Sequence, residues 1–241
     1  MMESKYIDEY RLKVSDYIKY DILAPHGVLD ILQDIAGKHS DTYTNLSFAE
    51  LLAQNKIWVL MRVKYKVIKN IPLYSKIKVE TWPKPKGLVD FDRETKIMDL
   101  EGNILIEAIS KWVIIDVASR KIIPAKHIEY NVPIPEDSIF NERIDKVKDF
   151  DVSNCNSYDV KVEFCDIDHN GHTNNARYAA MLLNALNLKE NEVIDEFQID
   201  FIHETMLHDN ITIYYHKEDN FYYAKALCNG NIVFLSKIKL K

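Results

Sequence analysis

The sequence predicts an α+β fold that is built twice along one chain. Two observations carry this prediction. The spacing of apolar residues changes from that of a helix to that of antiparallel strands in the first half, and the same change recurs in the second half. Apolar and turn residues of the two halves also correspond at nearly constant offsets. We therefore expect two related domains within the 241 residues rather than one large domain.

The first half reads as a strand, a helix and an antiparallel meander. Alternation over 9–23 predicts a strand, which Ala24-Pro25-His26-Gly27 ends. A helix reaching the early 40s is expected next, because the following apolar residues have helical spacing. These residues are Val28, Ile31, Leu32, Ile35 and Ala36. A short helix is expected at 48–54. Apolar residues alternate over 58–67, which predicts a strand, and further strands are expected at 76–82, 88–99 and, as a long apolar segment, 104–116.

The second half repeats this order after a segment from Pro124 to about Ser157, which holds three of the seven prolines and is interpreted as a linker. A strand is expected at 158–164, a helix with the same apolar spacing at 178–186, and a further strand at 197–201. Leu73 corresponds to Leu207 at an offset of 134 (207 − 73), and the same offset relates two further pairs of strand residues.

A helix followed by an antiparallel meander buries its apolar stripe against the sheet, which wraps around it. This is the hot-dog arrangement. Two copies in one chain predict a double hot dog, in which the pairing of single hot-dog domains is made within the chain. The expected domains are 1–130 and 158–241, with a linker at 131–157.

Composition restricts the class of protein. Hydrophobic residues make up 47% of the chain, and a net charge of −6 argues against general binding to nucleic acid or anionic membranes. There is no signal-peptide apolar region and no run of 18 apolar residues that would span a membrane. Three cysteines without CxxC spacing argue against a disulfide framework, so we expect a protein of the cytoplasm.

The chemistry is expected where the two halves differ. At the strand–helix break, the second half has Asp168-His169-Asn170-Gly171-His172 in place of Ala24-Pro25-His26-Gly27. After the helix it has His203-Glu204-Thr205 in place of Lys69-Asn70-Ile71. Only the second half carries carboxylates at both places. This difference predicts one active site, built mainly by the C-terminal half.

Local structure at the break is expected to place these side chains together. In an extended segment Asp168, Asn170 and His172 share one face, and Thr173 is positioned to cap the helix that follows. Each residue taken alone also has an ordinary role as a turn, cap or solvated residue. The functional interpretation rests on their occurrence together with Glu204 in one half only.

The sequence lacks the motifs of metal, serine-nucleophile and nucleotide-binding sites. His169 and His172 have neither an HExxH pattern nor a third ligand at a familiar interval, so no metal is expected. There is no serine motif of the GxSxG or SxxK type and no glycine-rich nucleotide motif, so no cofactor is expected. Cys165 is a conceivable thiol nucleophile, but its position at a strand end indicates a small core residue.

The sequence resembles the fatty acyl-[acyl carrier protein] thioesterases of plant plastids and bacteria. The family motif Asp-x-Asn-x-His-(Val)-Asn-Asn corresponds to 168–175, with Asp166 as the preceding acid and Thr173 in place of the usual valine. In the first half, four segments follow the family's order: Trp58-Val59 to Arg62, Glu80-Thr81-Trp82, the Arg93 region and Ser110-Lys111-Trp112. The resemblance covers most of 9–215 and implies a double hot dog.

The resemblance implies hydrolysis of the thioester that joins a fatty acyl chain to the phosphopantetheine arm of acyl carrier protein, in fatty acid biosynthesis. The residues that match the catalytic set are Asp168, Asn170, His172 and Glu204. An older proposal for the family places a cysteine nucleophile beside this glutamate. Thr205 stands there in this chain, which favours carboxylate and water chemistry.

Partners and alternative functions follow from the same residues. The first half, which lacks the acids, is expected to bind the acyl chain, and the protein to be a monomer or homodimer. Candidates for a basic surface that receives the acidic carrier protein are Lys84, Lys86, Arg120, Lys121 and Lys126. The alternatives are a hot-dog acyl-CoA thioesterase, a non-catalytic acyl-thioester-binding module and a hydratase on the same fold.

Overall fold

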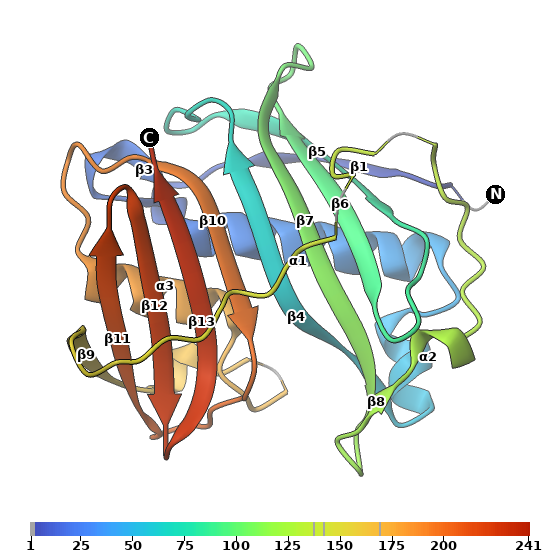
Figure 1. The fold of residues 1–241 in the computed structure, drawn as a ribbon. Helices are drawn as coiled ribbons and strands as arrows, with labels where there is room; N and C mark the ends of the chain where they lie inside the picture. The colour runs from blue at the N-terminus through green and yellow to red at the C-terminus, as the bar shows by residue number, and fades with distance from the viewer. Residues whose placement is uncertain (1–2, 137, 142, 169) are drawn as a thin grey trace. The chain divides into compact units, whose positions relative to one another are not determined.

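The computed structural model describes residues 3–136, 138–141, 143–168 and 170–241. These residues form two compact units (Figure 1). Unit 1 comprises Met1–Val14 and Asp30–Ile144, and unit 2 comprises Ser15–Leu29 and Asp145–Lys241. Each unit consists of an antiparallel sheet with a helix along one face, so the predicted α+β class is confirmed. The domain boundaries expected from the sequence stay a prediction.

Unit 1 contains the sheet β1-β5-β6-β7-β4, in which every neighbouring pair is antiparallel. Its strands are β1 (Tyr6–Arg11), β4 (Lys56–Val67), β5 (Lys76–Pro83), β6 (Phe91–Met98) and β7 (Ile104–Asp116), with β8 (Ile122–Ile123) paired to β7. Four of these strands match the predicted meander. Burial alternates along the first part of β5, from Lys76 to Thr81, whereas β7 is buried along most of its length.

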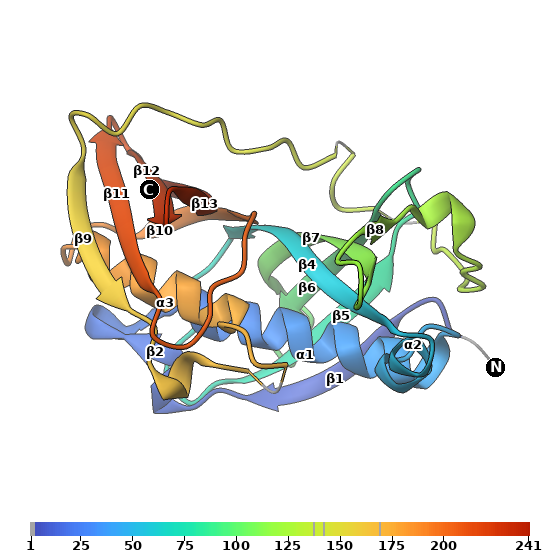
Figure 2. The same cartoon turned by 90° about the horizontal axis from the view of Figure 1, so that it is seen from below.

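Helix α1 (Pro25–Tyr43) lies along one face of this sheet, and its residues from Asp30 onward belong to unit 1 (Figure 2). The predicted stripe is buried, with Ile35 fully inaccessible to solvent. Polar contacts add to this packing, since Lys38 Nζ lies 2.7 Å from Asp8 Oδ2 on β1. Helix α2 (Phe48–Ala53) begins with a capping box formed by Ser47 and Glu50.

Unit 2 contains the sheet β10-β13-β12-β11-β9, again antiparallel throughout. Its strands are β9 (Asn156–Lys161), β10 (Ile194–Phe201), β11 (Asn210–Glu218), β12 (Phe221–Cys228) and β13 (Asn231–Leu240). Helix α3 (Asn175–Leu186) packs on it through Tyr178, whose ring centroid lies 6.1 Å from that of Phe201 and 5.8 Å from that of Phe234. The second half therefore repeats the helix-on-sheet arrangement of the first.

The predicted strand over 9–23 is wrong beyond Arg11. β1 ends there, and the chain continues through short 3-10 turns and a small hairpin of β2 (Tyr17–Ile18) and β3 (Ile22–Leu23). Tyr20 and Asp21 have φ values of 68° and 54°, and these left-handed conformations are incompatible with a continuous strand. The alternating pattern of the sequence does not correspond to alternating burial here, since only Leu23 of the four hairpin strand residues is buried.

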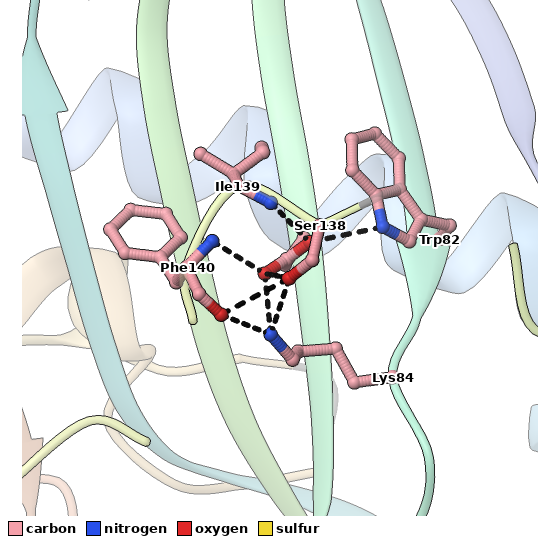
Figure 3. Close-up of polar contacts among 6 residues, drawn as sticks. Trp82, Lys84, Ser138, Ile139 and Phe140 are labelled. Atoms are coloured by element: carbon pink, nitrogen blue, oxygen red, sulfur yellow. Dashed lines mark hydrogen bonds and ion pairs between the residues drawn. The ribbon is translucent and has the colours of Figure 1, made fainter. Parts of the chain in front are cut away.

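The expected linker, 131–157, contains no helix or strand among its described residues up to 155, and its last two residues belong to β9. Part of it is anchored on unit 1 (Figure 3). The fully buried Glu94 side chain accepts hydrogen bonds from the backbone N–H groups of Ile139 (3.0 Å) and Phe140 (2.9 Å). Three side chains also donate to this carboxylate. They are Lys84 Nζ (2.7 Å), Ser138 Oγ (2.9 Å) and Trp82 Nε1 (3.1 Å). We call these six residues the Glu94 anchor.

Burial by itself raises the pKa of Glu94, because it removes water from the carboxylate. Hydrogen bonds from Lys84, from the two backbone N–H groups and from Ser138 outweigh that effect and leave the pKa below its usual value. The carboxylate is therefore charged in the folded protein and is held by donors on every side. The same lysine also donates to the carbonyl oxygen of Phe140.

Candidate active site

His172 and Glu204 meet in unit 2, although they are far apart in the sequence. His172 lies on the loop before α3, and Glu204 lies on the loop after β10. His172 Nε2 is 3.2 Å from Glu204 Oε2, and the two side chains are 23% and 40% exposed. An imidazole and a carboxylate at this separation are within hydrogen-bonding distance, and both remain accessible to water.

Asp168 acts on this loop through the backbone. Its Oδ1 accepts hydrogen bonds from the N–H groups of Asn170 (2.8 Å) and His172 (3.2 Å). The loop is a tight turn closed by the Asp168 N–H to the His172 carbonyl at 2.8 Å, with Gly171 at φ +84°. The expected extended segment is therefore wrong, because the aspartate side chain takes up the N–H groups that a strand would offer to a neighbour.

The remaining loop residues are only partly placed with respect to the pair. Asn170 is exposed on the turn, and its backbone N–H is held by Asp168. Its role toward a substrate stays a prediction. His169, which the sequence raised only as a possible metal ligand, lies outside the described residues. Elsewhere in the described chain, no cluster of three or more histidine, cysteine or acidic side chains is arranged to hold a metal ion.

Two sequence expectations near the site are wrong. Thr173 does not cap α3. Asn174 does, through a hydrogen bond from the Ala176 N–H to Asn174 Oδ1 at 2.8 Å. Cys165 is exposed and not part of the core, because β9 ends at Lys161 and the cysteine falls in the 3-10 turn Phe164–Asp166.

Sequence reasoning missed a buried group of three hydroxyls directly behind the pair. Thr173, Tyr178 and Thr205 are 5%, 3% and 1% exposed. Thr205 Oγ1 lies 2.8 Å from Thr173 Oγ1 and 2.9 Å from the Tyr178 hydroxyl. Tyr178 was assigned to the apolar stripe of α3. A tyrosine on a buried stripe needs a partner for its hydroxyl, and that requirement was the available signal.

The hydroxyl of Tyr178 remains protonated in the folded protein. Burial is the main cause that raises its pKa, and the negative charge of Glu204 raises it further. Hydrogen bonds from Thr205 and Thr173 oppose these effects without cancelling them. Tyr178 is thus a hydrogen-bonding group here and does not act as a base.

Two of the predicted basic residues are engaged within unit 1. Lys84 belongs to the Glu94 anchor, and Lys86 Nζ donates to the Ile128 carbonyl at 2.6 Å. The role of all five predicted basic residues in docking stays a prediction. Within the described residues, no helix is both long and apolar enough to cross a membrane.

Comparison with solved structures identifies the same fold in known proteins. An acyl-ACP thioesterase from Bacteroides thetaiotaomicron is 22% identical with a TM-score of 0.83, and the match covers 99% of this chain and 98% of that one. The 12:0-ACP thioesterase from Umbellularia californica is 15% identical with a TM-score of 0.84, covering 100% and 98%. The predicted double hot dog is thereby confirmed.

Curated relatives are similar over part of their length. A chloroplastic acyl-[acyl-carrier-protein] hydrolase of Cuphea viscosissima is 30% identical over 145 residues, which is 57% of this chain and 35% of the relative. The chloroplastic palmitoyl-acyl carrier protein thioesterase of Arabidopsis thaliana is 27% identical over 173 residues, 65% of this chain and 41% of the relative. The matched region thus spans less than half of these relatives.

Family models account for nearly the whole chain. The acyl-ACP thioesterase N-terminal domain matches residues 3–128, and the acyl-ACP thioesterase C-terminal domain matches residues 147–239. The His172–Glu204 pair lies within the second match. The chain belongs to the acyl-ACP thioesterase family.

Proposed function

We propose that the protein hydrolyses the thioester of fatty acyl-[acyl carrier protein], releasing free fatty acid and holo carrier protein in fatty acid biosynthesis. The observation that carries the proposal is the 3.2 Å contact between His172 and Glu204, within a chain of this family. A carboxylate and an imidazole in contact and open to solvent form a suitable pair for activating water and protonating a leaving thiolate.

In the proposed reaction Glu204 takes a proton from a water molecule as its oxygen attacks the thioester carbonyl carbon. The negative charge that develops on the carbonyl oxygen is stabilised by Asn170. When the carbon–sulfur bond breaks, His172 gives a proton to the phosphopantetheine thiolate and recovers one from Glu204 across their hydrogen bond. Asp168 keeps His172 in place through the backbone contacts of the turn.

Direct attack by Glu204, which would form a transient anhydride with the acyl group, is the alternative role for this carboxylate. Turnover in ¹⁸O-labelled water detects an anhydride that is opened at the glutamyl carbon, whereas opening at the fatty-acyl carbon gives the same labelling as general-base catalysis. Water that opens an anhydride at the glutamyl carbon leaves label in the Glu204 side chain, whereas general-base catalysis places label only in the fatty acid. Mass spectrometry of the peptide that contains Glu204 reads the outcome.

The two halves have different proposed roles. Residues 1–130 bind the acyl chain, 131–157 link the halves and 158–241 carry the catalytic residues. The apolar interior of unit 1 supports the first role in chemical terms, since its sheet carries fully buried apolar residues, including Ile77, Val79 and Ile97. The location in the cytoplasm and the oligomeric state, monomer or homodimer, stay predictions.

The deciding experiment incubates the purified full chain with acyl carrier proteins that carry acyl chains of different length, and with the matching acyl-CoA thioesters. Released fatty acids are quantified by mass spectrometry, which also detects a hydratase product. We expect release from acyl carrier protein with a higher kcat/KM than from acyl-CoA. Binding without turnover of any thioester would instead support the non-catalytic module.

Variants locate the activity in the proposed site. His172→Ala and Glu204→Ala should each lower kcat by about 10²-fold or more, the usual range for general acid–base groups. His203→Ala is the matched control, because this exposed histidine precedes Glu204 and its Nδ1 contacts the Ile232 carbonyl at 2.8 Å. Near-wild-type turnover in both site variants would refute the assignment.

A further inference from the structure

The His172–Glu204 contact needs support from the surrounding backbone. Both side chains are partly exposed, at 23% and 40%. Contacts between exposed charged side chains are worth about 0–1 kcal/mol, because water competes for both partners. Such a contact does not by itself fix two loops at one distance. The residues that follow His172 and Glu204 in the chain, Thr173 and Thr205, are the ones that are buried.

Thr173 joins the two loops directly. Its backbone N–H donates to the Thr205 carbonyl at 3.0 Å, and its Oγ1 donates to the same oxygen at 3.0 Å. Each of these threonines is covalently next to one member of the pair. The distance between the backbones of His172 and Glu204 is therefore set by hydrogen bonds one residue away from the reacting groups.

Tyr178 completes the arrangement from the first turns of α3. Its hydroxyl accepts the Thr205 N–H at 2.9 Å and lies 2.9 Å from Thr205 Oγ1. One proton assignment satisfies all three hydroxyls. Tyr178 donates to Thr205 Oγ1, Thr205 Oγ1 donates to Thr173 Oγ1, and Thr173 Oγ1 donates to the Thr205 carbonyl. Buried polar groups that satisfy one another in this way are rigid, because each lost contact leaves a buried group without a partner.

We propose that Tyr178 and Thr205 are positioning residues that fix Glu204 against His172 through the Thr173–Tyr178–Thr205 hydroxyl network. This inference rests on the proposed function for its kinetic consequence. It assigns no chemical step to either residue. Both are buried behind the pair, and their effect is transmitted through the backbone N–H and carbonyl of Thr205.

Two substitutions remove single hydroxyls with little change in shape. Tyr178→Phe removes the acceptor for the Thr205 N–H, and Thr205→Val removes Oγ1. Each should lower kcat by about tenfold or more with KM within about threefold of wild type, since small misplacements of a reacting group cost large factors in rate. Thr205→Ser keeps the hydroxyl and should retain kcat within about threefold, which separates the hydrogen bond from packing.

The matched control is Tyr222→Phe. Tyr222 is also a buried tyrosine of unit 2, and its hydroxyl donates to Glu192 Oε1 at 3.0 Å. This variant should lose stability to a similar degree but keep kcat. A double-mutant cycle measures the coupling between Tyr178 and Glu204 in kcat, and a general loss of stability does not change this coupling. In a Glu204→Gln background, Tyr178→Phe should have little further effect on kcat, because positioning acts through Glu204.

Kinetics and hydrogen exchange test the inference separately from the proposed function. If wild type releases fatty acid while Tyr178→Phe and Thr205→Val keep wild-type kcat, the inference is wrong and the function stands. Additive losses in the double-mutant cycle would also overturn it. If wild type is inactive on every acyl thioester, the proposed function fails. Amide hydrogen exchange at 203–206 then tests the inference by itself. Exchange should be faster in Tyr178→Phe than in wild type, and an unchanged rate would overturn the inference.

Discussion

Two glutamates, one in each unit, show how surroundings decide what a carboxylate does. Glu94 in unit 1 has a fully buried side chain and accepts hydrogen bonds from two backbone N–H groups and three side chains. Glu204 in unit 2 is 40% exposed and lies against His172 at 3.2 Å. The first is surrounded by donors. The Glu204 carboxylate is partly exposed to water and contacts the His172 imidazole.

This difference distinguishes a carboxylate that stabilises the fold, Glu94, from one that is suited to catalysis, Glu204. The donors around Glu94 lower its pKa despite burial, so exchanging its proton would break contacts that hold the chain together. A general base must take up and release a proton in each turnover, and Glu204 is both accessible to water and in contact with an imidazole, a group able to exchange a proton with it. Carboxylates with many donors are therefore poor candidates for catalysis, even when they are buried.

The largest expected effect comes from leaving Glu94 without its cation. Lys84→Met should lower the free energy of unfolding by about 3–5 kcal/mol, the usual cost of removing one partner from a buried ion pair. Lys86→Met is the control, since that ammonium contacts only a neutral carbonyl among the described contacts, at 2.6 Å. Its loss should cost about 1 kcal/mol. Urea unfolding measures both, and equal losses would refute a special role for the Glu94 anchor.

The second prediction exchanges the two glutamates for their amides. Glu204→Gln should lower kcat by about 10²-fold or more while leaving the free energy of unfolding within about 0.5 kcal/mol. Glu94→Gln should do the reverse, losing about 1–3 kcal/mol of stability because an amide nitrogen faces donors. Its kcat per folded molecule should stay near wild type. A stability loss in Glu204→Gln larger than that in Glu94→Gln would break the comparison.

The third prediction concerns pH. The pKa of Glu94 is lower in the folded protein than its ordinary value of 4.5. The unfolded state therefore binds the proton more readily, and the stabilisation is present above the ordinary pKa and is lost as pH falls through the folded pKa. Urea unfolding of wild type and Glu94→Gln should show a large difference in stability at pH 7 that shrinks below about pH 4.5. A difference independent of pH would contradict this account.

The smallest expected effect tests the turn at Asp168. Asp168→Asn keeps an oxygen that accepts the N–H groups of Asn170 and His172, so kcat should change by less than about threefold. Asp168→Ala removes that oxygen and should lower kcat by about fivefold, equivalent to about 1 kcal/mol for lost hydrogen bonds. Steady-state kinetics with acyl carrier protein substrates measures both. A larger loss in Asp168→Asn than in Asp168→Ala would indicate that the negative charge itself acts on the substrate.

The fold and two of the candidate site residues were accessible from the sequence for clear physical reasons. The helix stripe around Ile35 repeats with the period of a helix because one face is buried, and the strand at Ile104–Asp116 is recognisable as a long apolar segment because it is buried along most of its length. His172 and Glu204 were found by comparing the two halves, since a repeat that diverges at matching positions points to a special role for those positions.

Features that depend on tertiary contacts could not be predicted from the sequence. Tyr178 looks like any other member of an apolar stripe until Thr205, 27 positions later, is placed beside it. Glu94 falls in a predicted strand, and three of its five partner residues, Ser138, Ile139 and Phe140, come from a segment without helix or strand. The predicted strand over 9–23 is wrong for a local reason, because no side-chain pattern in the sequence indicates the positive φ values of Tyr20 and Asp21.

The Glu94 anchor also determines how freely the segment that it binds is able to vary. Glu94 contacts Ile139 and Phe140 through their backbone N–H groups, and Lys84 contacts the Phe140 carbonyl. These contacts do not depend on the side chains at the two positions. Proline alone is excluded there, because it has no N–H to donate. Only Ser138 contributes a side chain from this segment. The rest of the segment is constrained separately, because Val132 and Ile144 are buried and Arg62 Nη1 donates to the Ile144 carbonyl at 2.8 Å.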